Sequence, residues 1–153
     1  MATRLPVPAS SGVSRRMSRQ RRKDTAPEVS IRRLLHARGY RYRVAWPVPA
    51  MPRRSIDIAF TRLRVAVFID GCFWHSCPEH RTKPASNSDW WSEKLKANQI
   101  RDSETNAHLA GMGWSVIRIW EHEDPTEAVE AILSQHRRAL QTSRNVQQPM
   151  TSR

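Results

Sequence analysis

The sequence predicts a small α/β domain in which helices flank a mixed sheet. Three observations support this fold class. The chain has 153 residues, which is the length of one domain. Short segments rich in β-branched and aromatic residues alternate with segments whose apolar residues recur at helical spacing. The expected order is helix, three strands, helix, strand, helix, and this order favours helices packed against one central sheet.

The first expected helix begins with a capping-box pattern. Thr25 and Glu28 have the T-x-x-E spacing, and Pro27 lies in the first turn. Apolar residues then follow at helical spacing, and Gly39 is typical of a helix end. Residues 40–46 alternate aromatic or apolar residues with arginine, which predicts the first strand.

Two further strands and a long loop are expected next. A proline-rich segment, residues 47–52, predicts a loop. Residues 55–60 alternate again, and residues 65–70 (VAVFID) are almost continuously apolar, as in a central strand. Residues 71–88 contain turn-forming residues, both cysteines and two histidines, with no regular period. A loop of this length in a small domain usually has a function or its own cross-link.

The second half of the chain predicts two helices separated by a strand. Ser88 is expected to cap a helix over residues 89–110, which a pair of glycines ends. Residues 114–120 (WSVIRIW) predict another buried strand. Residues 124–127 (DPTE) form a second capping pattern, with proline at the first helical position, and open the last helix.

The charge of the chain favours a polyanionic partner. Lys and Arg number 26 against 14 Asp and Glu, so the formal net charge is +12. Nucleic acid is the first interpretation, and a basic surface kept for solubility is the alternative. No apolar run approaches the roughly 20 residues of a membrane span, and no signal peptide follows the first methionine. Membrane proteins, secreted disulfide scaffolds and fully disordered chains are therefore excluded.

The two ends of the chain are expected to lie outside the folded domain. Residues 1–14 are predicted to be a disordered basic N-terminus and residues 140–153 a disordered tail. The domain itself spans residues 15–139, and residues 15–24 are interpreted as a basic arm. Residues 1–23 contain seven basic residues and no acid. That composition fits either a transit peptide or an arm that lies in a DNA groove.

Four side chains of the kind that bind zinc lie close together in the long loop. Cys72, Cys77 and His80 form a C-x4-C-x2-H pattern, and zinc takes four Cys or His ligands in a tetrahedron. The fourth ligand would be His75 or a histidine from elsewhere in the chain. We favour His122, because residues at the ends of neighbouring strands can meet. The alternative is two buried thiols with unrelated histidines.

Acidic residues are scarce, so their positions are informative. Asp57 stands inside an apolar strand, where a carboxylate is costly unless it is paired or binds a cation. Asp70 ends the next strand, and with a carbonyl near Ile69 the two carboxylates predict a Mg²⁺ site. In a basic protein this indicates phosphodiester hydrolysis, with His75 as general acid or base. Glu28 is an outer candidate for the same site. The alternative for Asp57 is an ion pair with one of the arginines shortly before it.

Some aromatic residues do not have the pattern of a core. Phe73 and Trp74 are adjacent, as are Trp90 and Trp91, and adjacent side chains cannot all face one core. In a DNA-binding protein, exposed apolar side chains can wedge between base steps. Met17, among basic residues of the arm, has the same potential. The alternatives are core packing for Trp90 and a solvated side chain for Met17.

Taken together, these residues resemble the Vsr family, the very-short-patch-repair endonucleases that nick mismatched DNA. The central block is FIDGCFWHSCPEH at residues 68–80. Further similar segments are TAPE at 25–28, Ile56 with Asp57, Trp91 with Glu93, Lys94, Leu95 and Asn98, and the segment 113–122. The resemblance covers about residues 14–135.

The resemblance implies a restriction-endonuclease-like fold with a structural zinc. It implies Mg²⁺-dependent nicking of one strand, 5′ to the T of a T:G mismatch left by deamination of 5-methylcytosine. This reaction would initiate very short patch repair. The implied partners are double-stranded DNA with a T:G mismatch, mismatch-repair proteins and a repair polymerase. The implied state is a monomer, cytoplasmic and associated with the nucleoid, without contact to a membrane.

The resemblance also implies roles for individual residues. Asp57 would be the catalytic Mg²⁺ ligand beside the main-chain carbonyl of Ile69, and His75 would be the catalytic histidine. Glu28 and Asp70 would order water molecules around the metal. The zinc ligands would be Cys72, Cys77, His80 and His122. The side chains in contact with DNA would be Met17 in the minor groove, Phe73, Trp74 and Trp91 as a major-groove wedge, and Asn98.

From the residues alone, two other functions stay open. One is a zinc-containing DNA-binding module without hydrolytic activity. The other is an ordinary restriction enzyme that cuts both strands.

Overall fold

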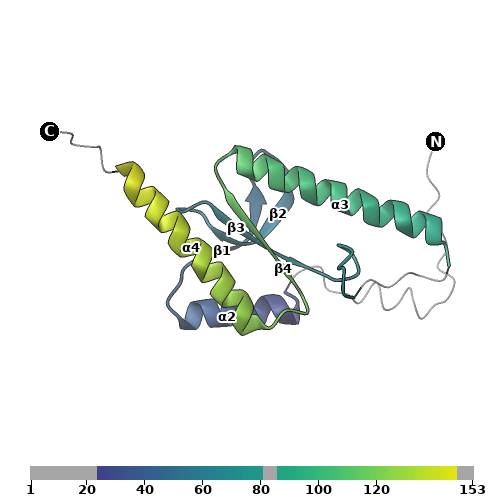
Figure 1. Ribbon diagram of the computed structural model, residues 1–153, viewed down its shortest axis with the longest axis horizontal. Coiled ribbons are helices and arrows are strands. Elements are labelled where there is room, and N and C mark those ends of the chain that lie inside the picture. Colours follow the sequence, from purple (N-terminus) through teal and green to yellow (C-terminus); the bar gives the residue numbers. More distant parts are fainter. Residues whose placement is uncertain (1–23, 81–85, 148–153) are drawn as a thin grey trace.

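A computed structural model describes residues 24–80 and 86–147 (Figure 1). In these ranges the four strands form one sheet in the order β1-β2-β3-β4. β1 and β2 are antiparallel, as are β2 and β3, whereas β3 and β4 are parallel. The predicted α/β fold with a mixed sheet flanked by helices is confirmed. The elements are α2 (Ala26–Ala37), β1 (Arg43–Val48), β2 (Met51–Phe60), β3 (Val65–Asp70), α3 (Ser88–Gly111), β4 (Ser115–Trp120) and α4 (Pro125–Gln147).

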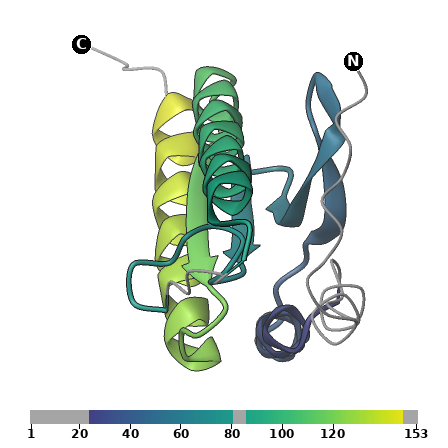
Figure 2. The same cartoon turned by 90° about the vertical axis from the view of Figure 1, so that its right-hand side faces the viewer.

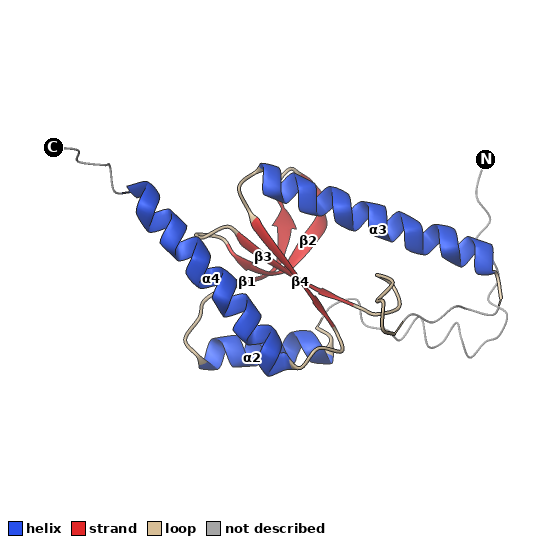
Figure 3. Ribbon diagram, in the orientation of Figure 1, coloured by secondary structure: helices blue, strands red, loops and turns tan. Residues whose placement is uncertain are grey.

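The helices lie on opposite sides of the sheet (Figures 2 and 3). α2 and α4 pack on one face, where Leu35 and Ile132 meet Val67 of the central strand β3. α3 packs on the other face, where Leu109 meets Phe68. Burial of these apolar side chains is the main term that stabilises such a layered domain. The long, nearly continuous apolar pattern of β3 follows from its central place, because both of its faces are covered.

The predicted loop over residues 47–52 is wrong. β1 continues to Val48 and β2 begins at Met51, so the two strands form a hairpin with a turn at Pro49 and Ala50. Ala50 has φ +62°, the left-handed conformation that a tight turn requires. Pro47 is tolerated because β1 is an edge strand, and an edge residue needs no N–H for a further neighbour. Pro49 lies in the turn, and Pro52 lies in a part of β2 that is not paired with β3.

The three expected helix caps have different outcomes. At α4 the prediction is confirmed, since Asp124 Oδ1 accepts hydrogen bonds from the backbone N–H of Thr126 (2.8 Å) and Glu127 (3.1 Å). At α2 Thr25 is the N-cap residue, but its side chain makes no capping hydrogen bond. At α3 the residue before the helix is Asn87, and Ser88 is already helical.

The predicted tail is wrong for residues 140–147, which continue α4. Nothing in the sequence ends the helix before this point, since it has no proline or glycine between residue 126 and Pro149. The N-terminal segment 1–14, arm residues 15–23 including Met17, and residues 148–153 lie outside the described residues. None of the described helices has the length and hydropathy needed to cross a membrane.

Candidate active site and metal centre

The candidate site forms where the parallel strands β3 and β4 end. Asp70 and Trp120 are paired in register, and the pairing continues one residue further through a hydrogen bond from Glu121 N to Asp70 O (2.9 Å). The Glu121 side chain then accepts a hydrogen bond from Cys72 N (2.9 Å). The loop after β3 is therefore held against the segment after β4, which brings it to His122.

The four predicted zinc ligands lie together. The donor atoms of Cys72, Cys77, His80 and His122 are all within 4.8 Å of one another. The His122 Nδ1 atom lies 3.1 Å from Cys72 Sγ and 3.7 Å from Cys77 Sγ, and Cys77 Sγ lies 3.9 Å from His80 Nδ1. Tetrahedral zinc with ordinary bond lengths has ligand-to-ligand separations of about 3.3–3.8 Å. Because both cysteines are free thiols, this donor set fits zinc.

The surroundings of the two thiols favour a cation. Burial, together with the neighbouring Cys77, raises the pKa of the Cys72 thiol to about 11. Burial also opposes ionisation of Cys77, but hydrogen bonds from His80 and from the backbone of Glu79 outweigh it and lower its pKa. The Glu79 carboxylate lies 3.3 Å from Nε2 of His122, the ring nitrogen that faces away from the thiols. Carboxylates in this position orient metal-binding histidines.

Asp57 lies in β2, and its side chain reaches the neighbouring strand β3. Its Oδ2 accepts a hydrogen bond from Ile69 N (2.8 Å). Burial raises the pKa of Asp57 to about 6, and the negative charges of Glu28 and Asp70 add to that rise. The negative charges that raise the pKa of Asp57 fit a divalent cation, which would relieve the repulsion at this carboxylate.

Arg54 does not support the alternative interpretation of Asp57 as a partner in an ion pair. That arginine turns toward α3, where it pairs with Glu104 (3.0 Å) and donates a hydrogen bond to Thr105 (2.9 Å). Glu28 accepts a hydrogen bond from the backbone N–H of Asp24 (2.9 Å). Its carboxylate therefore also holds the chain that leads into α2.

A residue that the sequence did not single out completes the site. Asp102 of α3 lies 2.5 Å from Nδ1 of His75, through its Oδ2 atom. Asp70 Oδ1 lies 3.8 Å from the same nitrogen. Among the described residues, Asp70, His75 and Asp102 form a second group whose donor atoms lie within 4.8 Å of one another, and Asp57 is not part of it.

Asp102 carries a sequence signal after all. It stands seven residues from Leu95 and seven from Leu109, both of which are buried, so the three residues share one face of α3. An aspartate on the inner face of a helix is costly without a partner. That position alone marks it as a candidate for the site.

The electrostatics of His75 result from opposing effects. Burial disfavours the charged imidazole, but the hydrogen bond with Asp102 and the charges of Asp70 and Asp102 outweigh it, so the pKa of His75 is raised. An ionised carboxylate only accepts hydrogen bonds. Nδ1 of His75 therefore carries the hydrogen and donates this bond to Asp102. The other nitrogen, Nε2, is then the acceptor of the neutral ring.

The aromatic residues form one cluster beside His75. The ring of Phe73 lies 5.2 Å from Trp74 and 5.4 Å from Trp91, between ring centroids, and Trp74 lies 5.8 Å from Trp91. Trp90 contacts Trp91 at 4.8 Å. All four are half-buried. The Asn98 amide donates to Trp74 O (3.2 Å), and so ties the loop to α3.

Comparison with known proteins identifies the family of this chain. Residues 9–81 match the family model described as DNA mismatch endonuclease Vsr. The chain is 45% identical over 130 residues to the type II nicking enzyme V.NaeI of Lentzea aerocolonigenes, covering 84% of this chain and 78% of that protein. The chain belongs to the Vsr family. Other relatives are V.XorIIP of Xanthomonas oryzae (40% identical; 70% and 77% covered) and the DNA mismatch endonuclease Vsr of Escherichia coli (34%; 65% and 62%).

Membership of the Vsr family makes the chain a DNA endonuclease, a hydrolase of phosphodiester bonds. The segment that matches the Vsr model contains Glu28, Asp57, Asp70 and His75. Asp102 and His122 lie beyond the matched segment, and the fold brings them to it.

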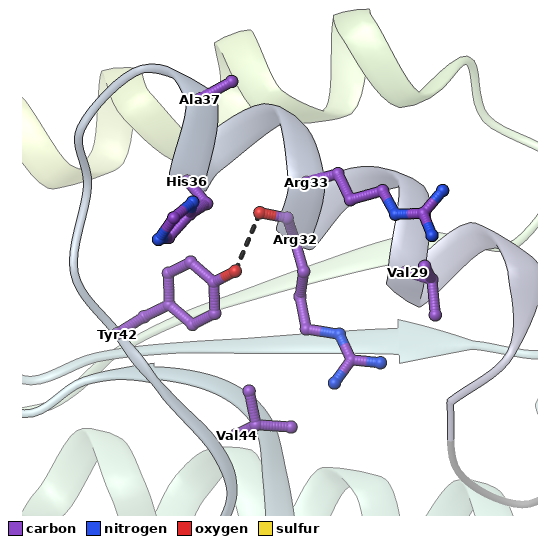
Figure 4. Close-up of a pocket in the computed structure, with 7 residues that line it drawn as sticks. All are labelled: Val29, Arg32, Arg33, His36, Ala37, Tyr42 and Val44. Atoms are coloured by element: carbon purple, nitrogen blue, oxygen red, sulfur yellow. Dashed lines mark hydrogen bonds between the residues drawn. The ribbon is translucent and has the colours of Figure 1, made fainter.

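A separate hollow lies between α2 and β1 of this Vsr-family chain (Figure 4). Its volume is about 430 Å³. Arg32 and Arg33 line it, and the Tyr42 hydroxyl donates a hydrogen bond to Arg32 O (2.7 Å) across it. None of the predicted catalytic or zinc residues lines this hollow.

Proposed function

We propose that this Vsr-family protein is a Mg²⁺-dependent nicking endonuclease that cleaves 5′ to the T of a T:G mismatch left by deamination of 5-methylcytosine. The nick would initiate very short patch repair. The observation that carries the proposal is the His75–Asp102 pair, which lies at the sheet edge beside a cluster of half-buried aromatic rings. The mixed sheet with helices on both faces supports a restriction-endonuclease-like fold.

The chemistry assigned to His75 follows from its hydrogen bonds. In the neutral form of the ring, Nδ1 donates its hydrogen bond to Asp102 and the Nε2 atom has a free lone pair. It therefore accepts a proton from the water that attacks the phosphorus, as a general base. Asp102 holds the ring in one orientation and stabilises the charge that forms on it.

We also propose two metal sites. Asp57, with the main-chain carbonyl of Ile69, would hold Mg²⁺, and Glu28 and Asp70 would order water around it. When bound, Mg²⁺ neutralises charge on the phosphate and lowers the pKa of water. Zinc would be held by Cys72, Cys77, His80 and His122, and it would fix the loop that carries His75.

Recognition of the mismatch is assigned to the aromatic cluster. Phe73 and Trp74 directly precede His75 in the chain, and Trp91 packs against both. Rings inserted between base steps would kink the duplex, and a T:G pair resists this less than a correct pair. Asn98 supports the cluster, and Met17 of the arm 15–24 would enter from the minor groove.

The remaining proposals concern the context of the reaction. The domain would span residues 15–139 and act as a monomer, because nicking one strand needs one active site. Its partners would be mismatched double-stranded DNA, mismatch-repair proteins and a repair polymerase. Its location would be cytoplasmic, on the nucleoid.

The test uses supercoiled plasmid and labelled duplexes with Mg²⁺. Each duplex carries one T:G pair in a different sequence context, and matched duplexes carry T:A. We expect nicked plasmid and cleavage only of the T strand of T:G duplexes. Linear plasmid would identify a restriction enzyme, and binding without cleavage would identify a binding module.

Variants locate the activity. Asp57→Ala is expected to abolish nicking, whereas Glu127→Ala, an exposed acid of α4, retains it. Phe73→Ala is expected to reduce discrimination between T:G and T:A duplexes. Equal cleavage of both duplexes by the wild type would refute the specificity.

A further inference from the structure

Arg118 is an unusual residue for its position. It stands within β4, in register with Phe68 of β3, among the apolar residues of a strand. Its side chain is 21% exposed. An arginine is rarely buried to this extent unless its donors are paired.

The partners of Arg118 come from two neighbouring elements. Its Nη1 atom lies 2.8 Å from Oδ1 and 3.0 Å from Oδ2 of Asp70, at the end of β3. Its Nε atom donates to Asn106 Oδ1 of α3 (3.0 Å). The guanidinium carbon lies 4.4 Å from the ring centroid of Phe68. Hydrogen bonds in two directions and a stacked face leave the guanidinium one orientation.

The same guanidinium reaches the second carboxylate of the site. Nη1 of Arg118 lies 3.6 Å from Asp102 Oδ1, while Asp102 Oδ2 contacts His75 Nδ1. Asp70 Oδ1, which Arg118 holds, lies 3.8 Å from that nitrogen. Arg118 therefore stands behind both carboxylates that flank the imidazole. Without it, two acids near a third, Asp57, would repel one another, and Asp70 would be buried without a cation.

We propose that Arg118 is a positioning residue of the nicking reaction, which holds Asp70 and Asp102 so that the His75 ring keeps one tautomer and one orientation. The inference rests on the proposed role of His75 and extends it. It also gives Asp70 a second role, as the anchor between Arg118 and the imidazole.

The competing explanation is that Arg118 only ties β4 to β3 and α3. Arg54 offers a matched control, because it also extends from a strand to α3, where it contacts Glu104, Thr105 and the carbonyl of Arg101. Arg54→Met removes a similar tie in which Asp70, His75 and Asp102 take no part. A purely structural role predicts that Arg118→Met and Arg54→Met have the same kind of effect.

The experiment measures kcat and KM on a T:G duplex for the wild type, Arg118→Met, Arg118→Lys and Arg54→Met. We expect Arg118→Met to lower kcat by about 10- to 100-fold, part of what a general base contributes, with little change in KM. Arg118→Lys keeps the positive charge but cannot donate hydrogen bonds in the same two directions. Its kcat should therefore lie between those of the wild type and Arg118→Met. Arg54→Met keeps the wild-type kcat.

A double variant removes the concern that Arg118→Met merely misfolds. Asp70→Asn/Arg118→Met leaves no unpaired buried charge, so it regains stability in urea unfolding. Because Asp70 is also placed around Mg²⁺, the kcat of the double variant is compared with that of Asp70→Asn alone, and it is expected to be lower because Arg118 also holds Asp102. A double variant with the kcat of Asp70→Asn would overturn the proposal.

A second readout does not depend on nicking. In ¹⁵N spectra of the histidine side chains at one fixed pH, the wild type is expected to show His75 as the Nδ1–H tautomer. Arg118→Met is expected to show a mixture of tautomers, and Arg54→Met the wild-type spectrum. If the wild type does not nick T:G DNA, the proposed function fails, but the spectra still decide whether Arg118 positions the ring. An unchanged His75 signal in folded Arg118→Met refutes it.

Discussion

Replacing Asp57 by asparagine is expected to stabilise the protein while abolishing nicking. Burial raises the pKa of Asp57 from 3.8 to about 6, with Glu28 and Asp70 adding to it. Each unit of pKa difference between the folded and unfolded chain corresponds to about 1.4 kcal/mol. The ionised carboxylate therefore destabilises the folded state by about 3 kcal/mol, and neutral asparagine removes that penalty.

The sign of the pH dependence follows from the raised pKa. Below pH 3.8 the carboxyl is protonated in both states and carries no penalty. As the pH rises from 3.8 to about 6, the carboxyl ionises in the unfolded chain before it ionises in the folded one, so the wild type loses stability relative to Asp57→Asn, and the loss is complete above the folded-state value. The stability gap should be about 1.5 kcal/mol at pH 5 and about 3 kcal/mol at pH 8.

The assay is urea unfolding from pH 5 to pH 8, with zinc present and Mg²⁺ omitted. A gap of 3 kcal/mol corresponds to a rise of about 6–12 °C in melting temperature for a domain of this size. Asp89→Asn, an exposed aspartate of α3, is the control and should show no gap. Adding Mg²⁺ should stabilise the wild type and not the variant. A gap that is independent of pH, or a less stable variant at pH 8, would refute the reasoning.

The other predictions concern the imidazole, the zinc ligands and the core. Asp102→Asn removes a charge-assisted hydrogen bond of about 1.5–3 kcal/mol, so nicking should slow by about 10- to 150-fold. Because Asp102 helps to raise the pKa of His75, the acidic limb of the kcat profile should move to lower pH in that variant. His122→Ala should lose bound zinc in elemental analysis, whereas His75→Ala should keep one zinc per chain, and the opposite result would exchange their roles. Leu109→Ala, at a fully buried position, should cost about 2–5 kcal/mol in urea unfolding with zinc content unchanged.

The elements that were predicted best are those with a strong local pattern. The apolar run at residues 65–70 and the Asp124 capping pattern were each correct to the residue. In both cases the physical cause is local, since a central strand needs apolar residues on both faces and a helix needs an N-cap acceptor.

The hairpin and the end of α4 could not be predicted from local sequence patterns. The prolines of residues 47–52 are typical of a loop, and those within strands are tolerated because Pro47 is in the edge strand β1 and Pro52 is in a part of β2 not paired with β3. Strand order depends on contacts between distant parts of the chain. The end of α4 beyond residue 139 has mostly exposed side chains, so no apolar period marks it.

The residues of the candidate site also fall into those that local sequence predicts and those that depend on packing between distant elements. The Cys72, Cys77 and His80 grouping follows from spacing within one loop, and the approach of His122 follows from the parallel ends of two strands. Asp102 and Arg118 are single charged residues on a helix and a strand. Their meeting depends on how α3 packs over the sheet, which the sequence shows only through their placement on inward-facing positions.

His75 stands between the two thiols proposed to bind zinc, three residues after Cys72 and two before Cys77. A newly made polypeptide without zinc would have the complete sheet and Asp57, but the loop that carries His75 would have no single conformation. Metal uptake would then be a maturation step for the nuclease. Genomic DNA would be spared cuts by immature molecules, and the specific activity of a preparation would rise in proportion to its zinc content.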